Sequence, residues 1–377
     1  MRITSVTTRL ISIDPRAFYA RRRAPQQFNM NWEFPLLEIA TDSGLKGYSM
    51  GRGTHGEGRG LAHAFQDIYG HRLIGRDPIN EPEALWQMFR RDNRHLYSIS
   101  DAPLGVIDVA LWDIRGKAAG LPLATLLGRY RNEIPTYATL GRQVLDTPEA
   151  VKASCLEAIE QGYTAAKVQL WEGPGEDIPR LTLARETVGD QYRLMHDVAG
   201  AYNLTEALRV GQVLSDLDYY WFEEPVPDSQ LALLRHLRSK LKVPILASET
   251  APLSDQHAYL REAACDILRS DVYITAGVTG LRKALAMAEL FGHTLEVHTA
   301  GVPLLDVAHI HVACSARNTE YVETPPPLFN FGLRTNPFAL TERGTLVCPD
   351  QPGLGVELDW DWLNAHTVET LIRTDDS

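Results

Sequence analysis

The segment YRLMHD (192–197) is the first of three short apolar runs that each end in a carboxylate; the other two are YYWFE (219–223) and PILASE (244–249). The three acids follow one another at steps of 26 residues. A step of this length holds one strand, one helix and two loops, which is the repeating unit of a parallel barrel. The C-terminal ends of barrel strands share one face, so we expect the three carboxylates to lie together there.

Five further strand-like segments flank these three runs. They are IPTYATL (134–140), TAAKVQL (164–170), ILRSD (267–271), TLEVH (294–298) and EYVE (320–323). The connections between them are long enough for helices, and turn pairs of the Asn-Gly type are absent, which favours parallel pairing. We therefore predict an α/β fold with a (β/α) barrel over residues 126–335.

The regions before and after the predicted barrel have a different pattern. Residues 1–125 contain two early strands, RITSVTTRLIS (2–12) and FPLLEIATD (34–42), followed by helical segments, and they are interpreted as an α+β domain. Residues 336–377 are too few for another strand-helix unit. We expect this last segment to return and pack on the first domain.

Composition excludes several classes of protein. The net charge of −11, with no basic run longer than Arg21-Arg22-Arg23, argues against nucleic acid or an anionic membrane as partner. The sequence contains no run of about 18 apolar residues, the length needed to span a membrane. The N-terminus lacks the continuous apolar core of a signal peptide. The 4 cysteines show no CxxC spacing, which is typical of reduced thiols. We expect a cytoplasmic protein that forms a homo-oligomer.

Asp197, Glu223 and Glu249, the acids that end the three runs, are candidate metal ligands. They offer only oxygen atoms, which suits a hard cation such as Mg²⁺, with Mn²⁺ as a possible substitute. The alternative is that they are solvated residues at strand ends, and the equal spacing disfavours it.

Other polar residues lie on the neighbouring strands. Lys167 and Gln169 alternate with apolar residues and so face the same side. A buried Lys167 could act as a base or hold a substrate carboxylate, whereas a lysine at the rim would only be solvated. Asp271 and His298 end adjacent strands and could form a general base and acid. Glu323 would complete the ring as a hydrogen-bond partner of substrate.

The first domain supplies candidate residues for a lid. GRGTHG (51–56) matches the pattern GxGxxG, but it lacks a convincing βαβ context and is a weak dinucleotide signal. We interpret it as a loop that closes over the active site, with Arg52 and His55 available to substrate. The segment 18–34 is rich in Arg, Gln and Asn and contains Trp32, which favours a polyhydroxylated acid over an aromatic one.

Over essentially its whole length, the chain resembles the enolase superfamily, mandelate racemase subgroup. The motifs that carry the resemblance are DVALWDIRGKAAGLPLATLLG (108–128), WFEEP (221–225), SDVYITAGVTG (270–280) and EVHTAG (296–301), together with the three acids. The resemblance implies a capping domain whose loops select substrate, a modified (β/α)7β barrel, and Mg²⁺-assisted removal of the proton α to a carboxylate by a Lys or His base.

Two departures from the family pattern bear on the reaction. The usual Lys-x-Lys of the second strand is Lys167-Val168-Gln169 here, and Ala199 stands where the family often has Asn after the first metal acid. A racemase needs a base on one face of the α-carbon and an acid on the other. Gln169 cannot take a proton, so one of these two groups is lost, whereas a dehydration needs one base only.

We therefore predict a hydro-lyase that dehydrates a sugar acid. The alternatives are a cycloisomerase or an epimerase that acts through the same enolate, and a catalytically silent protein that binds metal or acid.

Overall fold

The structure is a computed structural model that describes residues 1–17, 31–93, 95, 100–141, 145, 147–323 and 329–375. The predicted lid segment 18–34 lies outside the described residues except for residues 31–34. Within the described part of the chain, no helix is long and apolar enough to cross a membrane.

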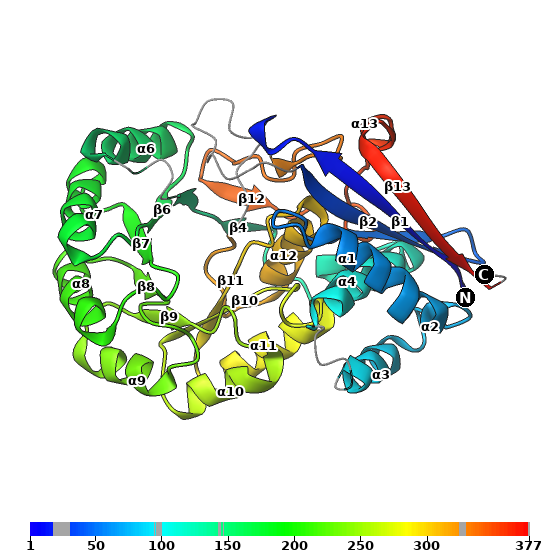
Figure 1. The fold of residues 1–377 in the computed structure, drawn as a ribbon, viewed down its shortest axis with the longest axis horizontal. Helices are drawn as coiled ribbons and strands as arrows, with labels where there is room; N and C mark the ends of the chain where they lie inside the picture. Colours follow the sequence, from blue (N-terminus) through cyan, green and yellow to red (C-terminus); the bar gives the residue numbers. More distant parts are fainter. Residues whose placement is uncertain are drawn as a thin grey trace.

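The two ends of the chain meet in one antiparallel sheet. Its order is β13-β1-β2-β3, with β1 at Ile3–Ile13, β2 at Trp32–Thr41, β3 at Lys46–Met50 and β13 at Thr367–Thr374. β13 pairs with β1 from Ser5↔Thr374 to Ile11↔Thr367, so the red and dark blue strands lie side by side in Figure 1. The C-terminal segment thus completes the capping domain, as predicted.

The capping domain also contains helices. They are α1 (Gly58–His63), a π-helical turn (Ala64–Gly70), α2 (His71–Leu73), α3 (Pro82–Asn93), α4 (Ala102–Ala119) and α5 (Leu123–Leu126). Of these, α1, the π-helical turn and α4 pack against the sheet. α4 is buried over most of its length because it lies between the sheet and the barrel. A Cβ atom at Gly47 would lie 2.1 Å from the Ala110 carbonyl oxygen, so this close approach of β3 to α4 requires glycine.

The second sheet is the parallel barrel, which occupies the left part of Figure 1. Its seven strands are β5 (Ala138–Leu140), β6 (Ala165–Gln169), β7 (Arg193–Asp197), β8 (Trp221–Glu223), β9 (Ile245–Ala247), β10 (Ile267–Ser270) and β11 (Thr294–Val297), paired in chain order. All neighbouring pairs are parallel, as the fold prediction requires.

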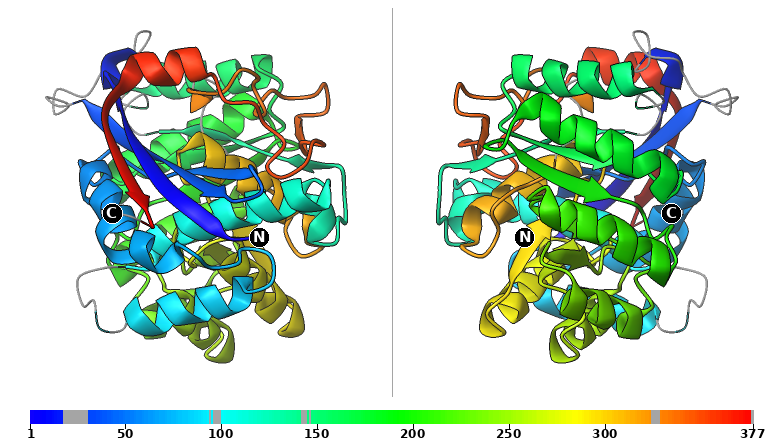
Figure 2. Two further views of the ribbon diagram at one scale, coloured as in Figure 1. Left: turned by 90° about the vertical axis from the view of Figure 1, so that its right-hand side faces the viewer. Right: turned by 90° about the vertical axis from the view of Figure 1, so that its left-hand side faces the viewer.

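Helices alternate with these strands and form the outer layer (Figure 2). They are α6 (Pro148–Glu160), α7 (Pro174–Val188), α8 (Leu204–Asp216), α9 (Leu231–Lys240), α10 (Leu253–Arg261), α11 (Val278–Leu290) and α12 (Pro303–Ser315). A last helix, α13 (Trp360–His366), precedes β13. The α/β barrel with its capping domain is therefore confirmed.

Two of the eight predicted strands differ from the prediction. The run 134–140 is two strands, because β4 (Glu133–Pro135) pairs antiparallel with β12 (Thr345–Val347) and only β5 joins the barrel. The run 320–323 forms a single parallel bridge, Val297↔Val322, instead of a strand. The Val322 amide also donates to the Pro135 carbonyl at 3.1 Å, so this short segment links β11 to the residues that lead into β5.

Aromatic residues fill part of the barrel interior beneath the strand ends. Trp221 is fully buried and makes edge-to-face contacts with Tyr137 and Tyr321, at centroid distances of 5.6 and 6.3 Å. Its indole Nε1 donates to Glu223 Oε2 at 3.0 Å. The apolar interior therefore ends directly at a carboxylate of the predicted site.

Candidate active site

The predicted site residues lie at the C-terminal ends of successive barrel strands. Asp197 and Glu223 are the last residues of β7 and β8 and are direct neighbours in the sheet register. Glu249 lies two residues beyond β9, while Asp271 and His298 directly follow β10 and β11. The parallel register therefore brings this set to one end of the barrel.

Lys167 is buried among three carboxylates. Its Nζ lies 3.3 Å from both Asp197 Oδ2 and Glu223 Oε2, and 3.1 Å from Glu323 Oε1, with only 1% of the side chain exposed. Burial alone would lower the pKa of Lys167, but the charges of Glu223 and Glu323 outweigh it and raise the pKa well above its ordinary value. Lys167 is thus held as an ammonium ion.

A second buried cation, Arg269 on β10, contacts two of these acids and also Glu249. Its Nε is 3.1 Å from Glu223 Oε1 and 3.8 Å from Glu249 Oε2. Its Nη2 contacts Glu323 and donates to the Tyr137 hydroxyl at 2.9 Å. Sequence reasoning missed Arg269, although period-two alternation in ILRSD places it on the same side as Asp271, two residues later.

Four buried or half-buried carboxylates therefore face two fixed cations. Burial raises the pKa of Glu223 to about 7 against the opposing charges of Arg269 and Lys167. For Asp197 burial acts in the same direction, but Lys167 and a hydrogen bond from Gln169 hold its pKa below the ordinary value. The excess of negative charge and the all-oxygen donor set suit a hard divalent cation.

The carboxylates of Asp197, Glu223 and Glu249 form ion pairs with Lys167 or Arg269 and do not converge on one point. Among the described residues, no group of three or more His, Cys, Asp or Glu side chains is arranged so that it could hold a metal ion. The assignment of Asp197, Glu223 and Glu249 as metal ligands therefore stays a prediction, supported by donor chemistry and charge.

His298 is held between two carboxylates. Its Nδ1 lies 2.9 Å from Asp271 Oδ2 and its Nε2 lies 3.3 Å from Glu249 Oε1. Burial would lower the pKa of His298, but the charge of Glu249 and the hydrogen bond to Asp271 raise it above its ordinary value. The Ile274 amide donates to Asp271 Oδ1 at 2.7 Å and so fixes the carboxylate that orients the ring.

The two positions that depart from the family pattern both contact Asp197. Gln169 Nε2 donates to Asp197 Oδ2 at 2.8 Å, and the Ala199 amide donates to Asp197 Oδ1 at 2.9 Å. Ala199 has a φ of 48°, in the left-handed region that costs free energy for a residue with a Cβ atom. Gln169 thus orients an acid at the position where the family pattern has a base.

Glu323 and the lid residues have different environments. Glu323 accepts from Thr139 Oγ1 at 2.6 Å in addition to its contacts with Lys167 and Arg269. Trp32 is 5% exposed, and its ring lies 6.3 Å from that of Phe34. Its packing is that of a core residue.

Arg52 brings the loop GRGTHG into contact with the barrel. The Arg52 guanidinium lies 5.7 Å from the ring centroid of Tyr273, two residues beyond Asp271. His55 is exposed and its Nδ1 lies 3.0 Å from Thr54 Oγ1. A Cβ atom at Gly53 would lie 1.9 Å from the Glu33 carbonyl oxygen, so packing against the start of β2 accounts for this glycine. The roles of Arg52, His55 and Trp32 towards substrate stay predictions.

Comparisons with known proteins agree with this architecture. Residues 20–128 match the mandelate racemase / muconate lactonizing enzyme N-terminal domain, and residues 150–362 match the enolase C-terminal domain-like family. The chain is 31% identical to D-galactarolactone cycloisomerase of Agrobacterium fabrum over 96% of this chain and 98% of that protein. It is also 31% identical to arabinonate dehydratase of Saccharolobus solfataricus, over 86% and 87% of the two chains.

A solved structure shows the same arrangement. D-glucarate dehydratase from Agrobacterium tumefaciens complexed with magnesium superposes with a TM-score of 0.85 and 26% sequence identity, covering 97% of this chain and 99% of that one. With both domains matched, the chain belongs to the enolase superfamily, in its mandelate racemase and muconate lactonizing enzyme branch.

Proposed function

We propose that this protein is a Mg²⁺-dependent dehydratase that removes the α-proton and the β-hydroxyl of a sugar acid to give a 2-keto-3-deoxy acid. The observation that carries the proposal is the one-sided arrangement of proton-transfer groups. His298, oriented by Asp271, can exchange a proton near neutral pH, whereas Lys167 is an ammonium ion among three carboxylates. Gln169 carries no titratable proton.

A proton next to a carboxylate is very weakly acidic, because its removal places a second negative charge on one group. A divalent cation held by Asp197, Glu223 and Glu249 would bind the substrate carboxylate and offset that charge. The ammonium of Lys167 adds positive charge at the same end of the barrel.

His298 performs both proton transfers in this scheme. Its Nδ1–H is directed at Asp271, so Nε2 takes the α-proton. The C–O bond at the β-carbon then breaks, and the leaving hydroxyl receives the proton from Nε2 and departs as water. The resulting enol converts to the keto acid, and the histidine returns to its neutral state.

An epimerase is less well supported by the same geometry. Inversion needs an acid or base on each face of the α-carbon, and Lys167 would have to be the second. The charges of Glu223 and Glu323 raise the pKa of Lys167 and so keep it protonated, and an ammonium ion cannot accept the α-proton.

A cycloisomerase is the second candidate, and one observation favours it. The relative D-galactarolactone cycloisomerase matches 96% of this chain, and that reaction class also begins with an α-proton. One competent base serves a ring-opening elimination as well as it serves a dehydration, and the mass of the product distinguishes the two reactions.

Product analysis tests the proposal directly. We incubate a library of sugar acids with the purified chain and Mg²⁺ and expect a 2-keto-3-deoxy acid, which is detected as its semicarbazone. Because one water molecule is lost, the mass of the free product should be ~18 mass units below that of the substrate. A product of unchanged mass from a lactone or anhydro acid would instead identify a cycloisomerase. No turnover and no α-proton exchange with Mg²⁺ bound would mean a catalytically silent protein.

The pH profile tests the role of Asp271. Because its carboxylate helps to raise the pKa of His298, neutral histidine forms only above the ordinary value of 6.5, and kcat/KM should fall as the pH drops below the raised pKa. In Asp271→Asn the imidazolium loses this stabilisation, so the acid limb should move to lower pH. At the same time, the maximum should fall because the ring is less well oriented. An acid limb at the same pH in both proteins would contradict this role.

A further inference from the structure

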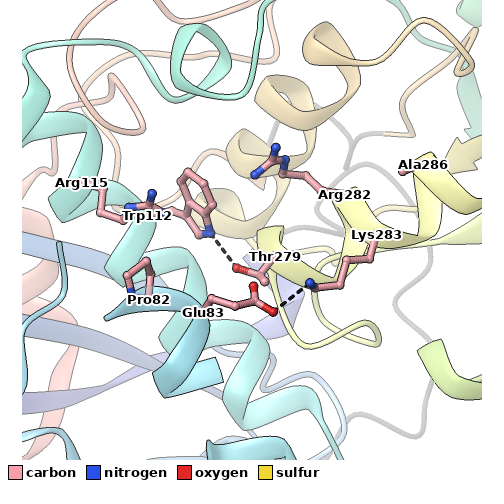
Figure 3. A pocket seen from close by; sticks show the side chains of 8 residues that line it. All are labelled: Pro82, Glu83, Trp112, Arg115, Thr279, Arg282, Lys283 and Ala286. Atoms are coloured by element: carbon pink, nitrogen blue, oxygen red, sulfur yellow. Dashed lines mark hydrogen bonds and ion pairs between the residues drawn. The ribbon is translucent and has the colours of Figure 1, made fainter. Parts of the chain in front are cut away.

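A pocket of about 370 Å³ lies outside the barrel, where α4 of the capping domain meets α11 of the barrel and the start of α3. Figure 3 shows Trp112 at its wall, with side chains from the three helices around it. The indole Nε1 donates to Thr279 Oγ1 at 2.9 Å, which fixes the ring in place. None of the proposed catalytic or metal-binding residues lines this pocket.

Two arginines form cation–π contacts with the indole of Trp112. The guanidinium carbon of Arg115 lies 3.8 Å from the ring centroid and that of Arg282 lies 5.5 Å from it. Among the residues that the structure describes, neither guanidinium is within ion-pair distance of a carboxylate. A cation–π contact supplies only part of the stabilisation that an anion would give.

The acids nearest to the two arginines are already engaged. Glu83 forms an ion pair with Lys283 at 2.9 Å. Buried Asp108 accepts from the Thr279 amide at 2.9 Å and from Thr279 Oγ1 at 2.8 Å. Both carboxylates therefore have other partners. Glu83 interacts electrostatically with Arg282, and Asp108 with Arg115, but among the described residues neither acid forms an ion pair with them.

The electrostatics of the pocket agree with this picture. Burial lowers the pKa of Arg115, Asp108 opposes this effect, and the positive charge of Arg282 lowers the pKa further. Burial raises the pKa of Asp108 to about 7, so its own negative charge is incomplete near neutral pH. Two like charges thus face one pocket in a chain whose net charge is −11.

We propose that this pocket binds a small oxyanion, a phosphate or a carboxylate group, through the guanidiniums of Arg115 and Arg282. Guanidinium groups present paired donors that match the oxygen atoms of both anions. The anion would lie between a helix of the capping domain and a helix of the barrel, so its binding should also stabilise the folded protein.

Calorimetric titration of the full chain tests the site. Inorganic phosphate and malonate are the two probes, and they distinguish a phosphate ligand from a carboxylate ligand. Both are titrated in EDTA at an ionic strength held constant with chloride, so that anions bound through a divalent cation do not contribute. We expect saturable binding of at least one probe, and a rise of a few degrees in melting temperature near saturation.

Matched variants assign the binding to the pocket. Arg115→Gln/Arg282→Gln should weaken binding by at least about tenfold, because two charge-assisted contacts are lost. Arg282→Gln alone should weaken anion binding to a smaller extent. Because Arg282 is exposed, this single variant replaces the double variant if the latter does not fold. Arg209→Gln/Arg235→Gln removes the same charge from exposed positions on α8 and α9 and should leave the affinity unchanged.

Two outcomes would overturn the proposal. One is the absence of binding by both probes. The other is equal affinity in the wild type and the Arg115/Arg282 variants, which would place the anion elsewhere on the protein.

Discussion

His298→Asn should abolish the exchange of the substrate α-proton with deuterated water and lower kcat by at least about 10²–10⁴-fold. The reason is that His298, oriented by Asp271, is the group proposed to take the α-proton and to return it to the leaving hydroxyl. Asparagine keeps a polar side chain of similar size but cannot accept the proton. Exchange is measured by NMR with the substrate found in the library screen.

Gln169→Ala is the matched control for this experiment. Gln169 contacts Asp197 from a neighbouring strand but exchanges no proton. We expect slower turnover, since Asp197 loses the hydrogen bond that orients it, with α-proton exchange retained. The reverse result, exchange retained in His298→Asn and lost in Gln169→Ala, would overturn the proposed base.

The regular part of the fold could be predicted because each barrel unit repeats the same pattern. A short strand-like run followed by a helix-length connection identifies β6 to β11 without reference to the rest of the chain. The first and last segments could not be predicted in the same way. β4 leaves the barrel because it pairs with β12, a partner about 210 residues later, and that pairing leaves no local signal in 134–140.

For the candidate site, the sequence identified which residues reach the strand ends but not how they pair there. Period-two alternation and strand ends point to Lys167 and the acids. The same alternation also applies to Arg269, yet a charged residue in a short strand is ordinarily interpreted as solvated. Its burial depends on carboxylates from three other segments, which only the closed barrel brings together.

Arg269→Met should lower the free energy of unfolding by about 3–5 kcal/mol in EDTA, the cost of removing one partner from a buried charge cluster. Methionine fills much of the same volume, so the loss should come mainly from charge. Glu223 and Glu323 lose a fully buried cation, and repulsion among the acids increases. Urea denaturation of the two proteins measures the difference.

Mg²⁺ should raise the free energy of unfolding of Arg269→Met more than that of the wild type. If the acids at the strand ends bind a divalent cation, removing Arg269 leaves more negative charge for the ion to offset. Saturating Mg²⁺ should then recover part of the lost stability.

Arg185→Met supplies the control. Arg185 is also buried, at 6% exposure, but its guanidinium donates to the carbonyl oxygens of four residues: Leu217, Gly189, Tyr192 and Asp218. Its loss should destabilise the fold by a mechanism that Mg²⁺ does not reverse. Equal recovery in both variants would mean that the ion binds away from the acids. No recovery in Arg269→Met would argue against a metal site at the ends of β7, β8 and β9.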